Sequence, residues 1–87
     1  MTYDVLSITI EKDAMRHRDG HFTIPKKVCE LLDLDPGDQV HLIIRTVKGD
    51  FLYAGKWQMK SGYEIYGGEL RERIKAGERI IVTVSKA

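Results

Sequence analysis

Residues 20–42, GHFTIPKKVCELLDLDPGDQVHL, contain a complete strand–helix–turn–strand unit. We expect a short strand at 21–24 that ends at Pro25, because proline has no N–H to offer a central ladder. Proline fits the first turn of a helix, where that N–H would have no partner anyway. The helix is predicted over 26–34. Its apolar positions recur at i, i+3 and i+4 and are Val28, Leu31 and Leu32.

The turn at 35–38, Asp-Pro-Gly-Asp, separates this helix from the next strand. Proline presets φ at the second turn position, and glycine tolerates a positive φ at the third. We therefore expect a positive φ at Gly37 and an Asp38 carboxylate that accepts hydrogen bonds from backbone N–H groups. The strand after the turn alternates in polarity, and its predicted buried residues are Val40, Leu42 and Ile44.

Three segments of this unit resemble the signature of the AbrB-like DNA-binding family, which includes SpoVT/AbrB proteins and MazE-type antitoxins. They are Ile24-Pro25-Lys26, the helix from Val28 to Leu34, and Pro36-Gly37-Asp38-Gln39-Val40. The family belongs to the cradle-loop barrels, in which a Gly-Asp turn before a strand is called a GD box. The resemblance covers residues 5–47, about half of the chain, and implies a barrel fold. It implies function less closely, because this class serves DNA binders, enzymes and adaptor domains.

The second part of the chain repeats the first in degenerate form. A first strand at 6–11, with Leu6, Ile8 and Ile10 facing inward, precedes the charged connection 12–20. The repeat offers a long strand at 51–60, a short strand at 63–66, a helix face of Leu70 and Ile74, a turn at Gly77, and a strand with Ile80, Val82 and Val84. We therefore expect one domain over 1–87, with β-β-α-β halves at about 3–47 and 50–86.

The predicted fold is mostly β with two short helices, arranged as a six-stranded, pseudo-two-fold cradle-loop barrel. The AbrB-like resemblance implies one half per subunit and a barrel closed by dimerisation. Because this chain holds both halves, it can close the barrel alone, as double-psi and RIFT-type barrels do. Closure would remove the open sheet edges that invite aggregation. The strand order and the formation of a homodimer are left open by the sequence.

Composition places the chain among ordinary soluble domains. Its 87 residues are 43% hydrophobic and 31% charged, with a net charge of +1. The apolar runs fall far short of the roughly 20 residues that a membrane span needs, and the start of the chain has no signal-peptide pattern. The single cysteine, Cys29, permits no internal disulfide, which favours a cytoplasmic location.

The AbrB-like resemblance implies DNA binding through the connection 12–20, and the matching region of the second half adds further cations. Cations on two loops at one side of a barrel suit the phosphates of duplex DNA, and Trp57 between two lysines suits stacking. The alternative is that these are solvated charges and that Trp57 belongs to the core. The predicted DNA-binding residues are Lys12, Arg16, His17, Arg18, His21, Lys26, Lys56 and Lys60.

The expected function is that of an AbrB-like transcription regulator; the alternative is a non-catalytic barrel that binds a protein or a small ligand. Two departures weaken the first: His21 stands where the family often has a basic residue, and Cys29 and Glu30 stand where it often has arginines. A basic cradle favours DNA, and an apolar groove favours the alternative. The MazE-type antitoxin function is disfavoured, because residues 85–87 follow the last strand and supply no acidic tail.

The sequence offers little support for catalysis, and we expect no enzyme activity, cofactor or metal. Cys29 fits a small, partly buried residue better than a nucleophile, because no histidine lies at a recognisable spacing. The histidines do not make a metal-ligand set with it. Gly67-Gly68 before a short helix fits a phosphate cradle, but Glu69 would repel an anion, and a simple turn is the commoner role.

Overall fold

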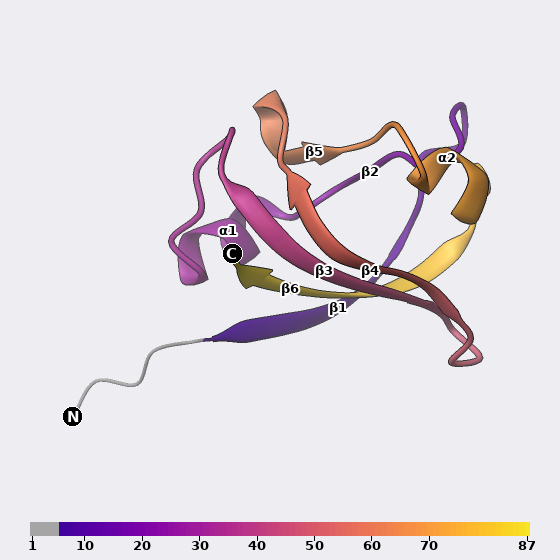
Figure 1. The fold of residues 1–87 in the computed structure, drawn as a ribbon, viewed down its shortest axis with the longest axis horizontal. Helices are drawn as coiled ribbons and strands as arrows, with labels where there is room; N and C mark the ends of the chain where they lie inside the picture. Colours follow the sequence, from indigo (N-terminus) through magenta and orange to yellow (C-terminus); the bar gives the residue numbers. More distant parts are fainter. Residues whose placement is uncertain (1–5) are drawn as a thin grey trace.

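The computed structural model describes residues 6–87 (Figure 1). Its elements follow one order twice, strand–strand–helix–strand, with a 3₁₀ turn inserted in the second half. They are β1 (Ser7–Asp13), β2 (Phe22–Thr23), α1 (Lys26–Leu31), β3 (Gln39–Thr46), β4 (Phe51–Gln58), η1 (Ser61–Tyr63), β5 (Glu64–Ile65), α2 (Leu70–Arg73) and β6 (Arg79–Lys86). The prediction of a mostly β chain with two short helices is confirmed. The expected start of the first half, near residue 3, lies outside the described residues.

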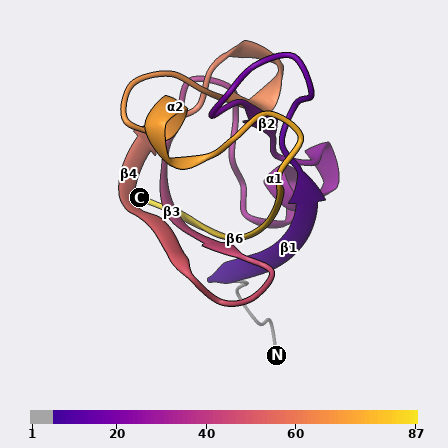
Figure 2. The same ribbon diagram turned by 90° about the vertical axis from the view of Figure 1, so that its right-hand side faces the viewer.

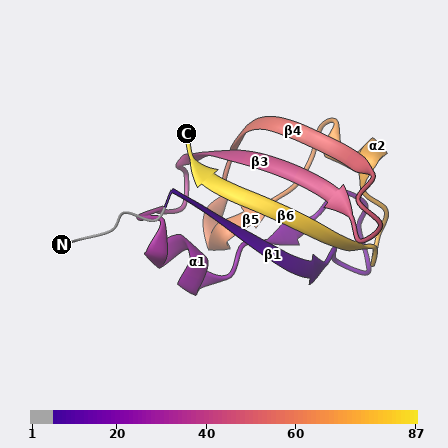
Figure 3. The same ribbon diagram turned by 90° about the horizontal axis from the view of Figure 1, so that it is seen from below.

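The strands form two antiparallel sheets. Four strands pair in the order β1-β6-β3-β4, and β2 pairs with β5 in a separate ribbon. The four-stranded sheet curves, and the ribbon lies across its concave side (Figures 1 and 3). Exchanging β1 with β4 and β3 with β6 leaves the sheet order unchanged. The two halves are therefore related by a pseudo-two-fold axis between the central strands β3 and β6.

The expected closed, six-stranded barrel is not what the described residues form. The ribbon joins the sheet edges through single backbone hydrogen bonds, Met15 N–H to the His21 carbonyl (2.7 Å) and Lys60 N–H to the Glu64 carbonyl (2.8 Å), instead of a ladder. The ribbon strands have two residues each. Pro25 ends the first, and positive φ at Tyr63 (59°) precedes the second. Strands this short cannot pair along both edges of the sheet, which stays open.

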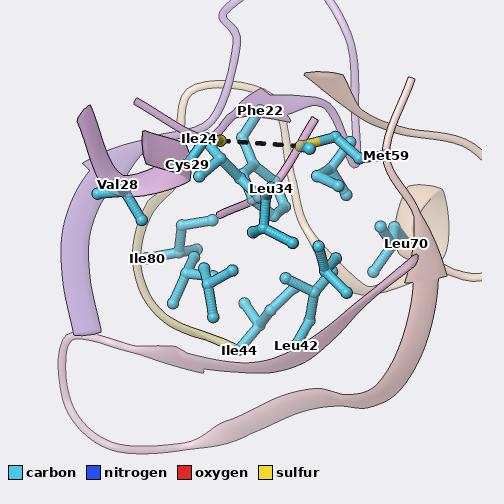
Figure 4. Packing of buried hydrophobic residues seen from close by; sticks show 14 of the residues in the cluster. Phe22, Ile24, Val28, Cys29, Leu34, Leu42, Ile44, Met59, Leu70 and Ile80 are labelled. Atoms are coloured by element: carbon cyan, nitrogen blue, oxygen red, sulfur yellow. Dashed lines mark hydrogen bonds between the residues drawn. The ribbon is translucent and has the colours of Figure 1, made fainter. Parts of the chain in front are cut away.

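The core lies between the sheet and the ribbon. The alternating triplets of β3 and β6 are fully buried as predicted, and they lie opposite each other in register, Leu42 with Val84 and Ile44 with Val82. Each such side chain contributes roughly 1.5–3 kcal/mol on burial. Other buried residues from the ribbon, the helices and the end of β4 complete the cluster: Phe22, Ile24, Met59, Ile65, Leu70 and Ile74. Figure 4 labels four of them, Phe22, Ile24, Met59 and Leu70.

One inward prediction for the first strand is wrong. Leu6 is 79% exposed, whereas Ile8 and Ile10 pack against the core. The pairing of β1 with β6 begins at Ser7, opposite Ser85. Leu6 therefore lies beyond the last paired residue and has no sheet face to follow.

Helix α1 is shorter than the predicted 26–34 and turns a different face to the core. The N–H groups of Asp33 and Leu34 donate to the carbonyls of Glu30 and Cys29, and Asp33 has a φ of 55°. This is a Schellman-type termination with aspartate in the position that glycine usually takes. Leu31, predicted to be inward, is 54% exposed. Its place is taken by Cys29, whose Sγ lies 4.0 Å from the Sδ of Met59 (Figure 4).

The turn after α1 has the predicted geometry, and the second half repeats it. Gly37 has a φ of 95°, and the Asp38 carboxylate accepts the Asp35 N–H at 2.8 Å. In the second copy Gly77 has a φ of 75°, and the Glu78 carboxylate accepts a backbone N–H at 3.1 Å. Each turn is also fastened to the opposite half. The Gly37 N–H donates to the Met59 carbonyl at 2.9 Å, and the Gly77 N–H donates to the Met15 carbonyl at 3.0 Å.

Candidate functional site

The connection between β1 and β2 is held firmly against α2. The Gly20 N–H donates to the Ile74 carbonyl at 2.8 Å, and a carboxylate oxygen of Asp19 accepts the Ala76 N–H at 2.7 Å. A Cβ added to Gly20 would lie 2.4 Å from the carbonyl carbon of Leu70, so only glycine permits this approach. The connection and α2 consequently lie at the same end of the molecule (Figure 2). Cations from the two halves meet there.

A depression of about 880 Å³ opens between these segments. Its lining residues come from the β1–β2 connection, the start of β2, the segment after β5, and α2; they are His17, Arg18, Asp19, His21, Tyr66, Gly67 and Arg71. A smaller depression of about 450 Å³ adjoins it and shares His17, Arg18, His21 and Tyr66 with it. Met15 and Glu64 complete the lining of the smaller one. We call the larger one the cationic depression.

His21 is the buried polar residue of this site, with only 5% of its surface exposed. Its Nε2 lies 3.1 Å from a carboxylate oxygen of Glu64, and its ring lies 4.7 Å from the ring of Tyr66, tilted by 44°. Its Nδ1 is enclosed and has no hydrogen-bond partner among the described residues. An unpartnered buried nitrogen is costly, because its hydration is lost without replacement.

The charge balance at the cationic depression is positive. Arg18 and Arg71 are exposed and permanently charged, and Lys60 adds an ammonium group 6.0 Å from the centre of the Tyr66 ring. The opposing carboxylates already accept hydrogen bonds: Asp19 from a backbone N–H and Glu64 from His21. The arrangement suits an anion that carries several acceptor oxygens.

The structure gathers some of the predicted site residues here and places others elsewhere. His17, Arg18 and His21 line the cationic depression, and Lys60 borders it through Tyr66. Arg16, on the same connection, runs beside Gly77. Lys26 is the first residue of α1, and Lys56 lies in β4 opposite His41.

Lys12 and Trp57 hold the fold together. The ammonium group of Lys12 donates to the carbonyl and, at 3.0 Å, to the hydroxyl of Thr23, which ties β1 to β2. Desolvation of this partly buried group lowers the pKa of Lys12. Trp57 is partly buried, packs against the core and meets the Tyr53 ring edge-on at a centroid distance of 5.7 Å. Both placements favour structural roles over DNA contact.

Sequence reasoning missed Arg71, Tyr66, Asp19 and Glu64. The pseudo-symmetry pointed to the β4–β5 region as the partner of the β1–β2 connection, whereas the connection packs on α2. Two sequence signals do mark the place: Asp19-Gly20 and Gly67-Gly68 flank the depression from opposite halves. These two pairs mark the site only because segments about fifty residues apart in sequence lie close together in the fold. The periodicity of apolar residues does not reveal such a long-range contact.

Within residues 6–87, no group of three or more histidine, cysteine or acidic side chains is placed to hold a metal ion. No helix in that range is long and apolar enough to cross a membrane. Burial, assisted by the charge of Glu30, raises the pKa of the Cys29 thiol and keeps it in its unreactive form.

Comparisons with known proteins identify a similar fold. No protein-family model matches the chain, and no curated protein matches it. The chain is similar to the solution structure of PHS018 from Pyrococcus horikoshii, with a TM-score of 0.68 and 20% sequence identity. The match covers 99% of this chain and 98% of that one. At this identity the two proteins share a fold.

Proposed function

We propose that this protein binds duplex DNA as an AbrB-like transcription regulator. The observation that carries the proposal is the meeting of Arg18 from one half and Arg71 from the other at one depression, beside His17. Arginine forks suit phosphate oxygens, and phosphate contacts supply most of the affinity of sequence-independent DNA binding. Arg16, exposed on the same β1–β2 connection, adds a further positive charge.

We also propose that the fold is an open member of the cradle-loop class. Two features support this: the pseudo-two-fold sheet order and the repeated turn in which a carboxylate after glycine accepts a backbone N–H. The resemblance to the AbrB-like family assigns DNA contact to the connection between the first two strands, and the β1–β2 connection lines the cationic depression.

The test is a fluorescence-anisotropy titration of labelled duplexes of unrelated sequence at about 50 and 200 mM NaCl. Because phosphate contacts carry no sequence information, Arg18→Ala should weaken binding similarly for all duplexes. Each lost contact should also reduce the magnitude of the slope of log K against log salt by roughly 0.9. Only a few cations are available, so we expect modest affinity per molecule and useful affinity when two molecules occupy one duplex.

A matched control is Arg45→Ala, which removes the same charge from an exposed position of β3 beside the β3–β4 turn. It should leave the salt slope unchanged. Absence of measurable binding at about 50 mM salt would refute the DNA proposal and favour the second candidate, a small-ligand-binding protein. That candidate is favoured by one observation, the buried and unpartnered nitrogen of His21 beside a depression of about 880 Å³.

A further inference from the structure

We propose that the cationic depression is a specific site for inorganic phosphate in its monohydrogen form. This goes beyond the DNA proposal, because the internal phosphodiesters of DNA carry no O–H group. The inference rests on three features of the site: two arginines, a histidine whose tautomer is set by a carboxylate, and the absence of a hydrogen-bond partner for the Nδ1 atom of that histidine among residues 6–87.

The arginines supply the charge. Arg18 belongs to the β1–β2 connection and Arg71 to α2, so the two residues line the depression from opposite halves of the chain. A guanidinium group binds oxyanions with two parallel N–H donors, and two such groups can hold three oxygens of a tetrahedral anion. Asp19, the acidic residue of the lining, already accepts the N–H of Ala76 at 2.7 Å.

Glu64 sets the tautomer of His21. An ionised carboxylate can only accept, so the contact of 3.1 Å requires a hydrogen on Nε2 of His21. In a neutral imidazole the other nitrogen then carries a lone pair and no hydrogen. Nδ1 of His21 is therefore a buried acceptor without a donor. The ring of Tyr66, 4.7 Å from that of His21, belongs to an exposed residue that lines the depression.

The arginine N–H donors together with one acceptor, Nδ1 of His21, favour an anion that has both acceptor oxygens and an O–H group. Monohydrogen phosphate offers three acceptor oxygens for the arginines and one O–H for Nδ1 of His21. Sulfate has the same shape and charge but no O–H. A phosphate monoester, whose second pKa is about 6, has lost its proton almost completely at pH 7.5. We therefore expect inorganic phosphate to bind more tightly than either.

The first experiment is an NMR titration of the ¹⁵N-labelled full chain with sodium phosphate or sodium sulfate, without DNA, at pH 7.5 and constant ionic strength. Phosphate should shift the imidazole nitrogens of His21 and the amides of Arg18 and Gly67 along saturable curves, with sulfate at least tenfold weaker. His41, exposed on β3, serves as the internal control and should not move. Equal affinity for the two anions, or shifts that do not saturate, would overturn the proposal.

Two variants separate the parts of the argument. Arg71→Ala should weaken phosphate binding at least tenfold, whereas Arg45→Ala should leave it unchanged. Glu64→Gln replaces the obligatory acceptor with an amide that can also donate to Nε2, so both tautomers of His21 become accessible. The preference for phosphate over sulfate should then fall several-fold while the backbone spectrum retains its dispersion. An unchanged preference would show that the tautomer does not select the anion.

The outcomes are distinguishable from those of the DNA experiment. Phosphate binding without duplex binding would leave this site intact and remove the proposed regulator. Duplex binding without saturable phosphate binding would leave the regulator and remove this site. If both occur, phosphate should displace DNA more strongly than sulfate at equal ionic strength, because both ligands require Arg18.

Discussion

Gly20 and Gly37 both have a positive φ but differ in their surroundings. Comparing alanine substitutions at the two positions therefore measures how much the packing of the β1–β2 connection against α2 contributes to stability. Gly20 has a φ of 67° and Gly37 a φ of 95°. A Cβ on Gly37 would meet nothing within 4 Å, whereas one on Gly20 would lie 2.4 Å from backbone atoms of Leu70. Alanine at either position incurs a left-handed strain of about 1–2 kcal/mol. The additional cost at Gly20 therefore isolates the contact with α2.

The size of that additional cost follows from the hydrogen bonds that the clash would break. Moving the connection away from α2 loses the bond from the Gly20 N–H to Ile74 and the bond between Asp19 and Ala76. At a net contribution of about 0.5–1.5 kcal/mol each, Gly20→Ala should destabilise the protein by about 2–5 kcal/mol. Gly37→Ala should lose about 1–2 kcal/mol.

Urea melts with a common m-value provide the measurement, and phosphate titration of the folded variant provides the functional readout. Gly20→Ala should also weaken phosphate binding, because it displaces Arg18 relative to Arg71. Gly37→Ala should not. Equal loss of stability in the two variants would mean that the connection does not depend on close approach to α2, and the geometry of the cationic depression would then have to be reconsidered.

Three further predictions concern Gly37, Lys12 and Cys29. Gly37→Val should cost more than Gly37→Ala, and well over 1 kcal/mol by urea melts, because β-branching increases strain at positive φ; an unchanged midpoint would contradict the turn geometry. Lys12→Met should lower the free energy of unfolding by about 1 kcal/mol, because the hydrogen bonds to Thr23 are lost. It should leave the slope of log K against log salt for DNA binding unchanged. A reduced slope would show that Lys12 contacts phosphate. Because burial raises the pKa of Cys29, the thiol ionises at lower pH in the unfolded chain than in the folded one, and the free energy of unfolding should fall as pH rises from about 8.5. In urea melts at pH 7.5 and 9.5, Cys29→Ala should lose less stability between the two pH values than the unsubstituted protein. An identical pH dependence in both proteins would rule out this contribution of Cys29.

The sequence predicted those parts of the fold that depend on local patterns. Alternation marked the buried faces of β3 and β6, and the Asp-Pro-Gly-Asp turn has the expected φ and carboxylate contact. The end of α1 was missed because Asp33 takes a left-handed conformation, which aspartate adopts far less often than glycine. Barrel closure was predicted wrongly, because it depends on ribbon strands long enough to pair with both edges of the sheet. The sequence pattern does not give the length of strands that have only two residues each.

The candidate site was predicted in part. The loop cations His17 and Arg18 were found because a family resemblance pointed to their connection. Arg71 was missed because its neighbours in sequence form a short charged helix that is ordinary by itself. The role of His21 depends on Glu64 and Tyr66, which lie more than forty residues away. Such pairs become visible only when the register of β2 against β5 is known.

The strand pairing makes the folding of each half of the chain depend on the other half. Within residues 6–87, every ladder joins a strand of one half to a strand of the other: β1 to β6, β2 to β5, and β3 to both β4 and β6. A half by itself would therefore have three strands and no partner for any of them. Fragments cut at the β3–β4 turn should be unfolded apart and structured when mixed, and the intact chain should melt in one transition.

The same pairing makes the interior of this chain resemble the interface between two subunits. The triplets of β3 and β6 pack on each other as two subunits would across a two-fold axis, and the turn at residues 47–50 only raises their effective concentration. Substitutions in either triplet should therefore affect association of the separated fragments as strongly as they affect folding of the whole. The same architecture could be built in two ways: by one half repeated in tandem in a single chain, or by two separate copies of one half in a homodimer. The two differ only in the turn that links the halves.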